Sequence, residues 1–286
     1  MKLAFSLIVH KSPEQAVALV RAIAGSGNYC VIHCNARSGP GFRQEIERGI
    51  SEAGLTNVRF IESEPLGWGS GRILRVELRA IEALLDWADD WTHHVNLSGQ
   101  CLPTKPIGEI AEILAANEGL SFMELMDFDK EAPHLAYRYQ RYHVELGGRL
   151  RNTRIPRSPP RDFKLWFGAF WCILSRKACL HVARSTEAQS ILQYLRYTRF
   201  PDELAFQTIL ANSPLRDSLV PRSRRLMLWD GDAAHPVVLT GEHWSEIDAD
   251  DLLFARKFDS EVDAEVIERL GRKIGCCLTT RSSQYA

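Results

Sequence analysis

The feature that most constrains the fold is the alternation of apolar runs and amphipathic helical patterns in the first 125 residues. Residues 3–9 form a continuous apolar run, typical of a strand buried on both faces. Ser12-Pro13-Glu14-Gln15 then has the form of a capping box and opens a helical pattern that continues to Gly25. Further apolar runs at 29–33 and 58–61 flank a helical stretch at about 41–53. This rhythm predicts an α/β fold with a central, mostly parallel sheet flanked by helices.

The rest of the chain continues this rhythm less regularly. The predicted elements are a helix after the glycine-rich turn 66–71, strands at 93–97 and 120–125, a helix at 107–116, strand character within 165–175, a helix near 177–184, strands at 226–229 and 237–239, and a last helix at 263–270. Residues 130–164 are basic and aromatic, with many arginines and two successive prolines. That composition predicts an irregular, mobile loop lying over the cleft.

Composition narrows the class of protein. A chain of 286 residues that is 45% hydrophobic buries a large core, and we predict a single domain over residues 1–286. Thirty-five basic and thirty-six acidic residues give a net charge of −1, which argues against a nucleic-acid partner despite the basic stretch at 130–164. The seven cysteines include no CxxC pair, which is typical of a reducing compartment and suggests neither a disulfide scaffold nor a zinc site.

The N-terminus begins like a signal peptide, but His10 and Lys11 interrupt its apolar run and no small-residue cleavage site follows. We therefore interpret it as the first buried strand. No window approaches the roughly 18 apolar residues of a spanning helix. The sequence predicts at most peripheral contact with a membrane.

Ligands of open parallel sheets bind beyond the carboxyl ends of the strands. This rule selects Val9 with His10, Asn35 to Arg37, and Glu64 with Pro65 as lining residues. The turn at 66–71 holds Trp68, whose indole is suited to stacking on a base or a sugar. The turn is neither a P-loop nor a GxGxxG fingerprint, so alone it is a weak signal.

Residues 200–210 carry the candidate catalytic carboxylates. Pro201 suits the first position of a helix, which places Asp202 and Glu203 in the first turn, facing outward, with apolar residues behind them. The positive end of the helix dipole favours an ionised carboxylate, the form that a general base needs. Acidic residues are also ordinary at helix starts, and on this segment alone that second interpretation stays open.

Eight segments in order resemble one family. They are SLIVHKSPEQAVALVRAI, YCVIHCNARS, LGWGSGRILRVELRAIEALL, HHVNLSGQCLPTKPIGEI, SFMEL, WFGAFWCILSRKA, FPDELAFQTIL and LLFARKFD. Together they resemble the core-2/I-branching family of glycosyltransferases, which includes the peptide xylosyltransferases. The resemblance implies a GT-A-like fold and metal-independent transfer of a sugar, with inversion, from a UDP-sugar to a hydroxyl of a glycan or glycoconjugate. No cofactor besides this donor is expected.

The resemblance also implies roles for individual residues. Glu203 matches the family's general base, Lys257 with Arg256 beside it matches the diphosphate-binding element, and Glu124 matches the glutamate that holds the acceptor sugar. Val9, His10 and Asn35 match the edge that binds uridine, and Trp68 belongs to the same donor group. Asp202 and Trp229 complete the predicted acceptor group. Residues 1–125 would form the nucleotide-binding half, and residues 126–286 the acceptor-binding and catalytic half.

Several positions depart from the family pattern. Asn35 and Cys101 replace aspartates, and Val237 stands where the branching enzymes place a second phosphate-binding arginine, a role that Arg222, Arg224 or Arg225 would have to take over. Phe170 occupies the position at which peptide xylosyltransferases carry an aspartate. This last difference favours N-acetylglucosamine over xylose as the transferred sugar.

Two alternatives remain at this stage. One is a metal-dependent transferase that uses a DxD triplet, for which the sequence offers 127–129, 230–232 and 248–250, the first being the most suitable because it follows a strand. The other is a binding protein that kept the fold and lost turnover, against which the retention of Glu203 with Lys257 argues. The cysteines and the absence of an anchor lead us to expect a cytoplasmic enzyme that builds a surface polysaccharide or a lipid-linked glycan.

Overall fold

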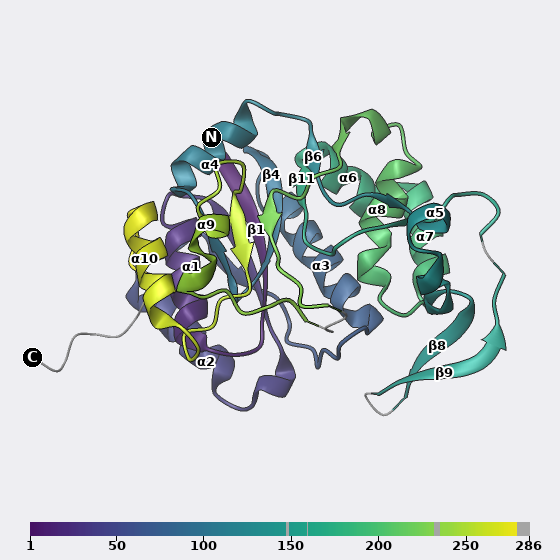
Figure 1. Ribbon diagram of the computed structural model, residues 1–286, viewed down its shortest axis with the longest axis horizontal. Coiled ribbons are helices and arrows are strands. Elements are labelled where there is room, and N and C mark those ends of the chain that lie inside the picture. Colours follow the sequence, from purple (N-terminus) through teal and green to yellow (C-terminus); the bar gives the residue numbers. More distant parts are fainter. Residues whose placement is uncertain (147–148, 159, 232–234, 279–286) are drawn as a thin grey trace, which may run out of the picture. The chain divides into compact units, whose positions relative to one another are not determined.

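A computed structural model describes the chain except for residues 147–148, 159, 232–234 and 279–286. Within this part, the main sheet has the strand order β12-β6-β11-β4-β1-β2-β3 (Figure 1). Its strands are β1 (Lys2–Val9), β2 (Tyr29–Cys34), β3 (Val58–Phe60), β4 (Trp91–Ser98), β6 (Ser121–Phe122), β11 (Ile173–Ser175) and β12 (Leu219–Val220). Strand β2 pairs in parallel with β1 and β3, and β12 pairs in parallel with β6, whereas β11 is antiparallel to both β4 and β6. The predicted α/β fold with a mostly parallel sheet is confirmed.

The chain forms two compact units, each built from separate stretches of sequence. Unit 1 comprises Met1–Glu62, Leu97–Asn117 and the described chain from Arg224 onward, and unit 2 comprises Ser63–Asn96 and Glu118–Ser223. The assignment of residues 1–125 to nucleotide binding and of 126–286 to acceptor binding and catalysis stays a prediction.

Unit 1 contains the parallel strands β1, β2 and β3. Its helices are α1 (Pro13–Ala24), α2 (Phe42–Glu52), α4 (Ile107–Ala115), α9 (Trp244–Ile247) and α10 (Ala264–Ile274), with 3-10 turns η1 (Ala36–Ser38) and η5 (Gly241–His243). A second sheet joins β13 (Arg225–Leu226), β14 (Phe254–Arg256) and β5 (Cys101–Pro103). Helix α1 packs closely on α2 at Gly49, where a Cβ atom would lie only 2.8 Å from Cγ2 of Val17. This close contact is one reason for a glycine inside a helix.

Two details of unit 1 differ from the prediction. Ser12 has a left-handed backbone (φ 50°) and makes no side-chain cap, so the predicted capping box is wrong, although α1 begins at Pro13 as expected. The predicted strand at 237–239 is not a strand, and the one at 226–229 is shortened to β13. Residues 237–239 make isolated backbone hydrogen bonds, from Val237 to the carbonyl of Leu228 and from Leu239 to the carbonyl of Lys257, and these bonds to two different segments do not form a continuous ladder.

Unit 2 contains the helices α3 (Gly71–Trp87), α5 (Phe128–Glu131), α6 (Arg176–Arg184), α7 (Thr186–Leu195) and α8 (Ala205–Ala211), with 3-10 turns η2 (Pro133–Arg138), η3 (Pro201–Glu203) and η4 (Arg216–Ser218). Ser70 caps α3 by accepting a hydrogen bond from the N–H of Arg72. The short strands β7 (Met126–Asp127) and β10 (Trp166–Phe167) pair in an antiparallel ladder. Of the predicted strand at 120–125, only Ser121–Phe122 is a strand, and the predicted strand at 165–175 is divided into β10 and β11.

The stretch 130–164 is not the irregular, mobile loop that was predicted. It contains part of α5, the turn η2 and a hairpin of β8 (Arg141–Leu146) and β9 (Arg149–Pro156). These strands are rich in arginine and carry few apolar residues, so the alternation of apolar and polar residues that normally reveals a strand is weak. Among the described helices, none is both long enough and apolar enough to cross a bilayer.

Candidate active site

The candidate base Glu203 lies on a turn, not in the first turn of a helix. Pro201–Glu203 form the separate 3-10 turn η3, Leu204 breaks the helical geometry with φ −124°, and α8 begins at Ala205. Phe200, directly before the turn, has a left-handed backbone (φ 53°). The predicted helix start at Pro201 is wrong in this detail, because the chain reverses at Phe200 before it enters η3.

The reversal at Phe200 is fixed by the glycine-rich turn at 67–69. The N–H of Phe200 donates to the carbonyl of Gly69 at 3.2 Å. A side chain at Gly69 has no room, since a Cβ would lie 2.8 Å from the Phe200 ring and φ is +73°. The indole of Trp68 meets the Phe200 ring edge to face at 4.7 Å, and 58% of Trp68 is exposed. The structure thus brings Trp68, predicted as a donor-binding residue, beside the turn that carries Glu203.

Arg138 forms an ion pair with the Glu203 carboxylate. The guanidinium of Arg138 lies over the Phe200 ring at 4.7 Å and near the Phe167 ring at 5.3 Å. Thirty per cent of the Glu203 side chain remains exposed, so the carboxylate is accessible to a small substrate group. Sequence reasoning missed Arg138, because nothing distinguishes it from the other arginines of the 130–164 stretch.

Glu124 and Glu203 are linked through two successive peptide N–H groups. The N–H of Gly168 donates to the Glu203 carbonyl at 3.1 Å, and the N–H of Ala169 donates to the Glu124 carboxylate, also at 3.1 Å. Burial raises the pKa of Glu124, the bond from Ala169 opposes this shift, and the charge of Glu203 adds to it. The predicted base and the predicted acceptor-binding acid therefore lie in one electrostatic neighbourhood.

Side chains of α8 and β4 hold this linking segment in place. Gln207 donates to the carbonyl of Ala169 at 2.8 Å, and the Thr208 hydroxyl bonds both the N–H and the carbonyl of Trp166. Asn96 donates to the carbonyl of Phe170 at 2.9 Å. Phe170, which stands where xylosyltransferases carry an aspartate, is buried and stacks on Phe206. The segment is thus fixed on both sides of Gly168.

Asp202 is buried, which corrects the expectation that both acids of the turn face outward. Its relative exposure is 6%, and its Oδ1 atom has no hydrogen-bond partner within the described chain. Burial raises the pKa of Asp202 to about 7, and the neighbouring Glu203 charge contributes. The predicted acceptor-binding role of Asp202 stays a prediction.

In unit 1, the predicted uridine-binding residues meet at the carboxyl ends of β1 and β2. The N–H of Asn35 donates to the carbonyl of Val9 at 2.9 Å, and the Ser38 hydroxyl donates to the carbonyl of His10 at 2.8 Å. The Asn35 side chain accepts from the N–H of Arg37 at 3.1 Å and so caps η1. An aspartate could accept the same bond, so Asn35 preserves the local turn while removing a negative charge.

Cationic side chains gather in the same unit. Burial lowers the pKa of Lys257, and the charges of Arg256 and Lys11 lower it further, with Asp259 opposing them. Burial also lowers the pKa of His10, as do the charges of Lys257, Lys11 and Arg256. His10 is therefore neutral near pH 7, beside a group of cations that a bound anion would stabilise.

A buried cysteine contacts a further arginine of this unit. The guanidinium of Arg225 donates to the sulfur of Cys101 at 3.4 Å, and the N–H of Ser98 donates to the same sulfur at 3.3 Å. Both Arg225 and Cys101 are buried. The Cys101 sulfur therefore accepts hydrogen bonds at the position where the family commonly has an aspartate.

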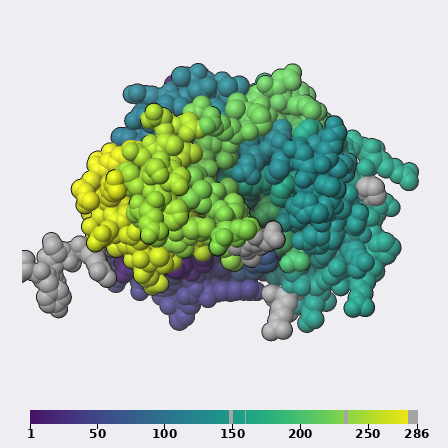
Figure 2. Space-filling view, viewed as in Figure 1, coloured from purple at the N-terminus to yellow at the C-terminus, as the bar shows by residue number. Residues whose placement is uncertain are grey.

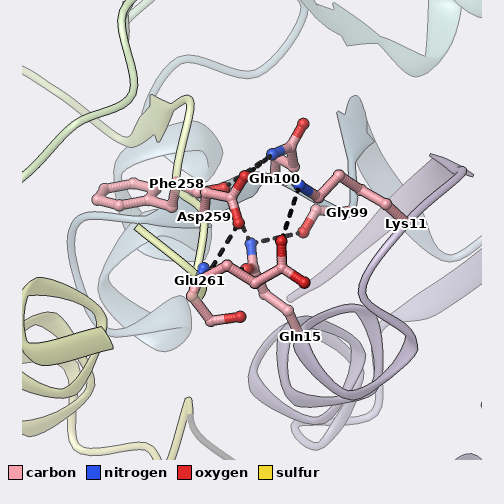
Figure 3. A network of polar contacts seen from close by, with 8 residues as sticks. Lys11, Gln15, Gly99, Gln100, Phe258, Asp259 and Glu261 are labelled. Atoms are coloured by element: carbon pink, nitrogen blue, oxygen red, sulfur yellow. Dashed lines mark hydrogen bonds and ion pairs between the residues drawn. The ribbon is translucent and has the colours of Figure 1, made fainter. Parts of the chain in front are cut away.

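The segment that carries Lys257 is held by the polar network in Figure 3. Lys11 pairs with Asp259 at 2.6 Å, and Gln100 donates to the carbonyl of Phe258 and to the Asp259 carboxylate. Gln15 donates to the carbonyls of Gly99 and Phe258. The sequence did not predict Lys11 and Asp259 as site residues, although both lie inside the segments that resemble the family. No local pattern reveals an ion pair between residues so far apart in the chain.

The remaining predicted residue, Trp229, belongs to unit 1 and is 55% exposed, whereas Glu124, Asp202 and Glu203 belong to unit 2. Its acceptor-binding role stays a prediction.

Of the DxD candidates, Asp127 is paired with Lys164 at 2.5 Å and Asp248 with Lys273, while Asp232 lies outside the described residues. Within the described ranges, no group of three or more His, Cys, Asp and Glu side chains is placed to hold a metal ion.

Comparison with known proteins assigns the chain to a family. The sequence model of the Core-2/I-Branching enzyme family matches residues 3–253. The chain belongs to this family, as its motifs predicted.

Its relatives are glycosyltransferases. The chain is 27% identical to xylosyltransferase 2 of Canis lupus familiaris, over 94% of the chain and 33% of that protein. It is 26% identical to beta-1,3-galactosyl-O-glycosyl-glycoprotein beta-1,6-N-acetylglucosaminyltransferase 3 of Rattus norvegicus, over 94% of the chain and 67% of that protein. The chain thus spans about a third of the length of the xylosyltransferase. Among solved structures, mouse xyloside xylosyltransferase 1 in its apo form is similar, with a TM-score of 0.41 and 12% identity over 88% of the chain and 97% of that structure.

Proposed function

We propose that this chain is an inverting glycosyltransferase that moves a sugar from a UDP-sugar to an acceptor hydroxyl with Glu203 as the general base. The observation that carries the proposal is the arrangement around Glu203, an accessible carboxylate paired with Arg138 and joined to Glu124 through the N–H groups of Gly168 and Ala169. Family membership and the transferase activities of the relatives support it.

The proposed reaction needs one base. The Glu203 carboxylate takes the proton of the acceptor hydroxyl as that oxygen attacks the anomeric carbon from the face opposite UDP. A bond forms between the acceptor oxygen and the sugar, the bond to the diphosphate breaks, and UDP leaves with the electron pair. Arg138 keeps the carboxylate oriented, and Glu124 accepts hydrogen bonds from the acceptor sugar.

The cations of unit 1 supply the second requirement, which is stabilisation of the negative charge on the leaving diphosphate. We assign this role to Lys257 and Arg256, with Lys11 beside them. Charge-assisted hydrogen bonds from fixed cations are about twice as strong as neutral ones and act here without a metal ion. Val9, His10 and Asn35 would contact the uridine, and Trp68 would stack against a sugar or a base. With these roles, we propose that the α/β fold is of the GT-A-like class.

For the donor, we favour UDP-N-acetylglucosamine over UDP-xylose. The support is Phe170, a buried aromatic residue at the position where peptide xylosyltransferases carry an aspartate. The acceptor would be a hydroxyl of a glycan or glycoconjugate. We propose a reducing, cytoplasmic setting for the enzyme, which is supported by the absence of a CxxC pair among the seven cysteines of the sequence.

A panel of UDP-sugars assayed for UDP release, with and without EDTA, tests the proposal. We expect release from at least one donor, strongest with UDP-N-acetylglucosamine, and the same rate in EDTA. A rate abolished by EDTA and restored by Mn²⁺ would favour the DxD mechanism. Calorimetric binding of UDP without turnover on any donor or acceptor would instead indicate a non-catalytic binding protein.

A further inference from the structure

The hairpin β8–β9 presents two chemically different faces. On β8, His143 and Glu145 point toward the body of unit 2. His143 is buried and its N–H donates to the carbonyl of Tyr197 at 2.9 Å. Glu145 accepts from the Ser70 hydroxyl at 2.8 Å and pairs with Arg72 at 3.0 Å. These contacts define the inner face and attach the hairpin firmly at that side.

The outer face is both apolar and basic. Val144 and Leu146 alternate with the inner residues along β8 and therefore project from the opposite side, whereas Tyr142 lies at an irregularity of the ladder and packs on the Tyr197 ring at 5.8 Å. Leu146 is 64% exposed, and the register places Arg151 opposite Val144. Arg154 and Ile155 follow in the irregular part of β9, both exposed, Ile155 by 58%. In Figure 1 the hairpin extends away from α7, and its teal segment lies at the surface in Figure 2.

The hairpin as a whole carries a local excess of positive charge. Residues 141–156 hold four arginines and one acid, Glu145, which the inner face engages. The whole chain, by contrast, has a net charge of −1. A concentration of arginines on an otherwise balanced molecule marks an anion-binding surface rather than a general attraction to polyanions.

The aliphatic side chains decide which kind of anion fits. Nucleic acids are bound through cations and aromatic stacking, whereas Leu and Ile gain nothing from water-exposed phosphates. At a lipid surface, aliphatic side chains enter the acyl boundary, and arginines bind headgroup phosphates. We infer that the outer face of the β8–β9 hairpin docks on a membrane surface rich in anionic phospholipids.

The inference does not rest on the proposed reaction, because it concerns binding alone. Vesicle sedimentation of the full chain tests it, with vesicles of phosphatidylcholine alone or with 30 mol% (about one lipid in three) phosphatidylglycerol. We expect binding to the anionic vesicles only, weakening as salt is raised. One arginine near an anionic surface strengthens binding by about fivefold, so Arg151→Glu with Arg154→Glu should weaken binding by about 25-fold or more.

A second double variant, Leu146→Ser with Ile155→Ser, should also weaken vesicle binding, which a purely electrostatic surface would not show. The matched control is Arg48→Glu with Arg272→Glu, two exposed helix positions outside the hairpin that change the net charge equally. Circular dichroism confirms that each variant is folded. Equal losses in the control and hairpin variants would overturn the inference. Hairpin-dependent binding to RNA or heparin without binding to anionic vesicles would overturn it as well.

Discussion

At the scale of single residues, the ion pair between Arg138 and Glu203 shapes the chemistry. A carboxylate that acts as a base must be aimed at its substrate, and the ion pair with Arg138 fixes the orientation of the Glu203 carboxylate. The aromatic rings of Phe167 and Phe200 hold the guanidinium, which limits its freedom. Arg138 is therefore a positioning residue in this account. Two carboxyl groups adjacent in sequence, Asp202 and Glu203, thus lie in opposite environments.

Asp202 gives a prediction at this scale. Folding raises the pKa of Asp202 to about 7, so between about pH 4 and pH 7 the folded chain keeps a proton that the unfolded chain has lost. The free energy of unfolding contributed by Asp202 therefore falls as the pH rises through this window. An asparagine side chain cannot ionise, so Asp202→Asn should gain stability relative to the wild type from pH 4 to pH 8, by up to a few kcal/mol.

Chemical denaturation of both proteins at pH 4, 6 and 8 measures this difference. The conservative control is Asp217→Asn, an exposed aspartate of η4, whose effect should not change over the same range. A difference between Asp202→Asn and wild type that is constant with pH would show that Asp202 is ionised in the folded state, against this account.

At the scale of elements, the segment 166–170 organises the acids of unit 2. Gly168 is required there, because a Cβ would lie 2.1 Å from the carbonyl oxygen of Glu124 and 2.7 Å from its carbon, both of them backbone atoms. Gly168→Ala should cost about 1–3 kcal/mol of stability and displace the N–H groups that hold Glu124 and Glu203. Donor turnover should fall with it.

Gly108→Ala is the matched control for this variant. Gly108 lies in α4 with nothing within 4 Å of the added Cβ, so alanine should stabilise the helix slightly, by about 0.5–1 kcal/mol. Thermal unfolding and UDP release, measured side by side, distinguish the two positions. A Gly168→Ala protein as stable and as active as the Gly108→Ala protein would contradict the role given to this segment.

Elements with a single strong period could be predicted from the sequence, and elements defined by long-range pairing could not. The helices α1, α2, α3 and α10 lie close to their predicted ranges, because an amphipathic period survives within one element. The hairpin β8–β9 was missed because arginines obscure its alternation. Gly168 and Arg138 were missed for another reason, because their roles come from contacts with distant residues. Gly168 packs against the backbone of Glu124, 44 positions away, and Arg138 pairs with Glu203, 65 positions away.

At the scale of the whole molecule, the proposed diphosphate-binding and base residues belong to different units. The cations around Lys257 belong to unit 1, and the carboxylates around Glu203 belong to unit 2. The sequence predicted most of these residues because the family motifs carry them, but it did not predict that unit 1 combines both ends of the chain while unit 2 is built from its middle. Binding of the nucleotide and activation of the acceptor should therefore be separable by mutation.

Lys257→Ala tests the nucleotide side of this division. Losing a charge-assisted contact to the diphosphate should weaken UDP binding by about 10- to 100-fold and lower turnover as well. Titration calorimetry with UDP measures the affinity, and Lys177→Ala, at an exposed position of α6, is the control. Unchanged UDP affinity in Lys257→Ala would remove Lys257 from the diphosphate site.

Glu203→Gln tests whether Glu203 is the general base. The amide keeps the size of the side chain but cannot accept the proton, so turnover of the preferred UDP-sugar and acceptor should fall by about 100-fold or more. UDP affinity should stay within about twofold of wild type, and Glu187→Gln, an exposed glutamate of α7, should leave both values unchanged. A Glu203→Gln protein that turns over at the wild-type rate would contradict the assignment of Glu203 as the base.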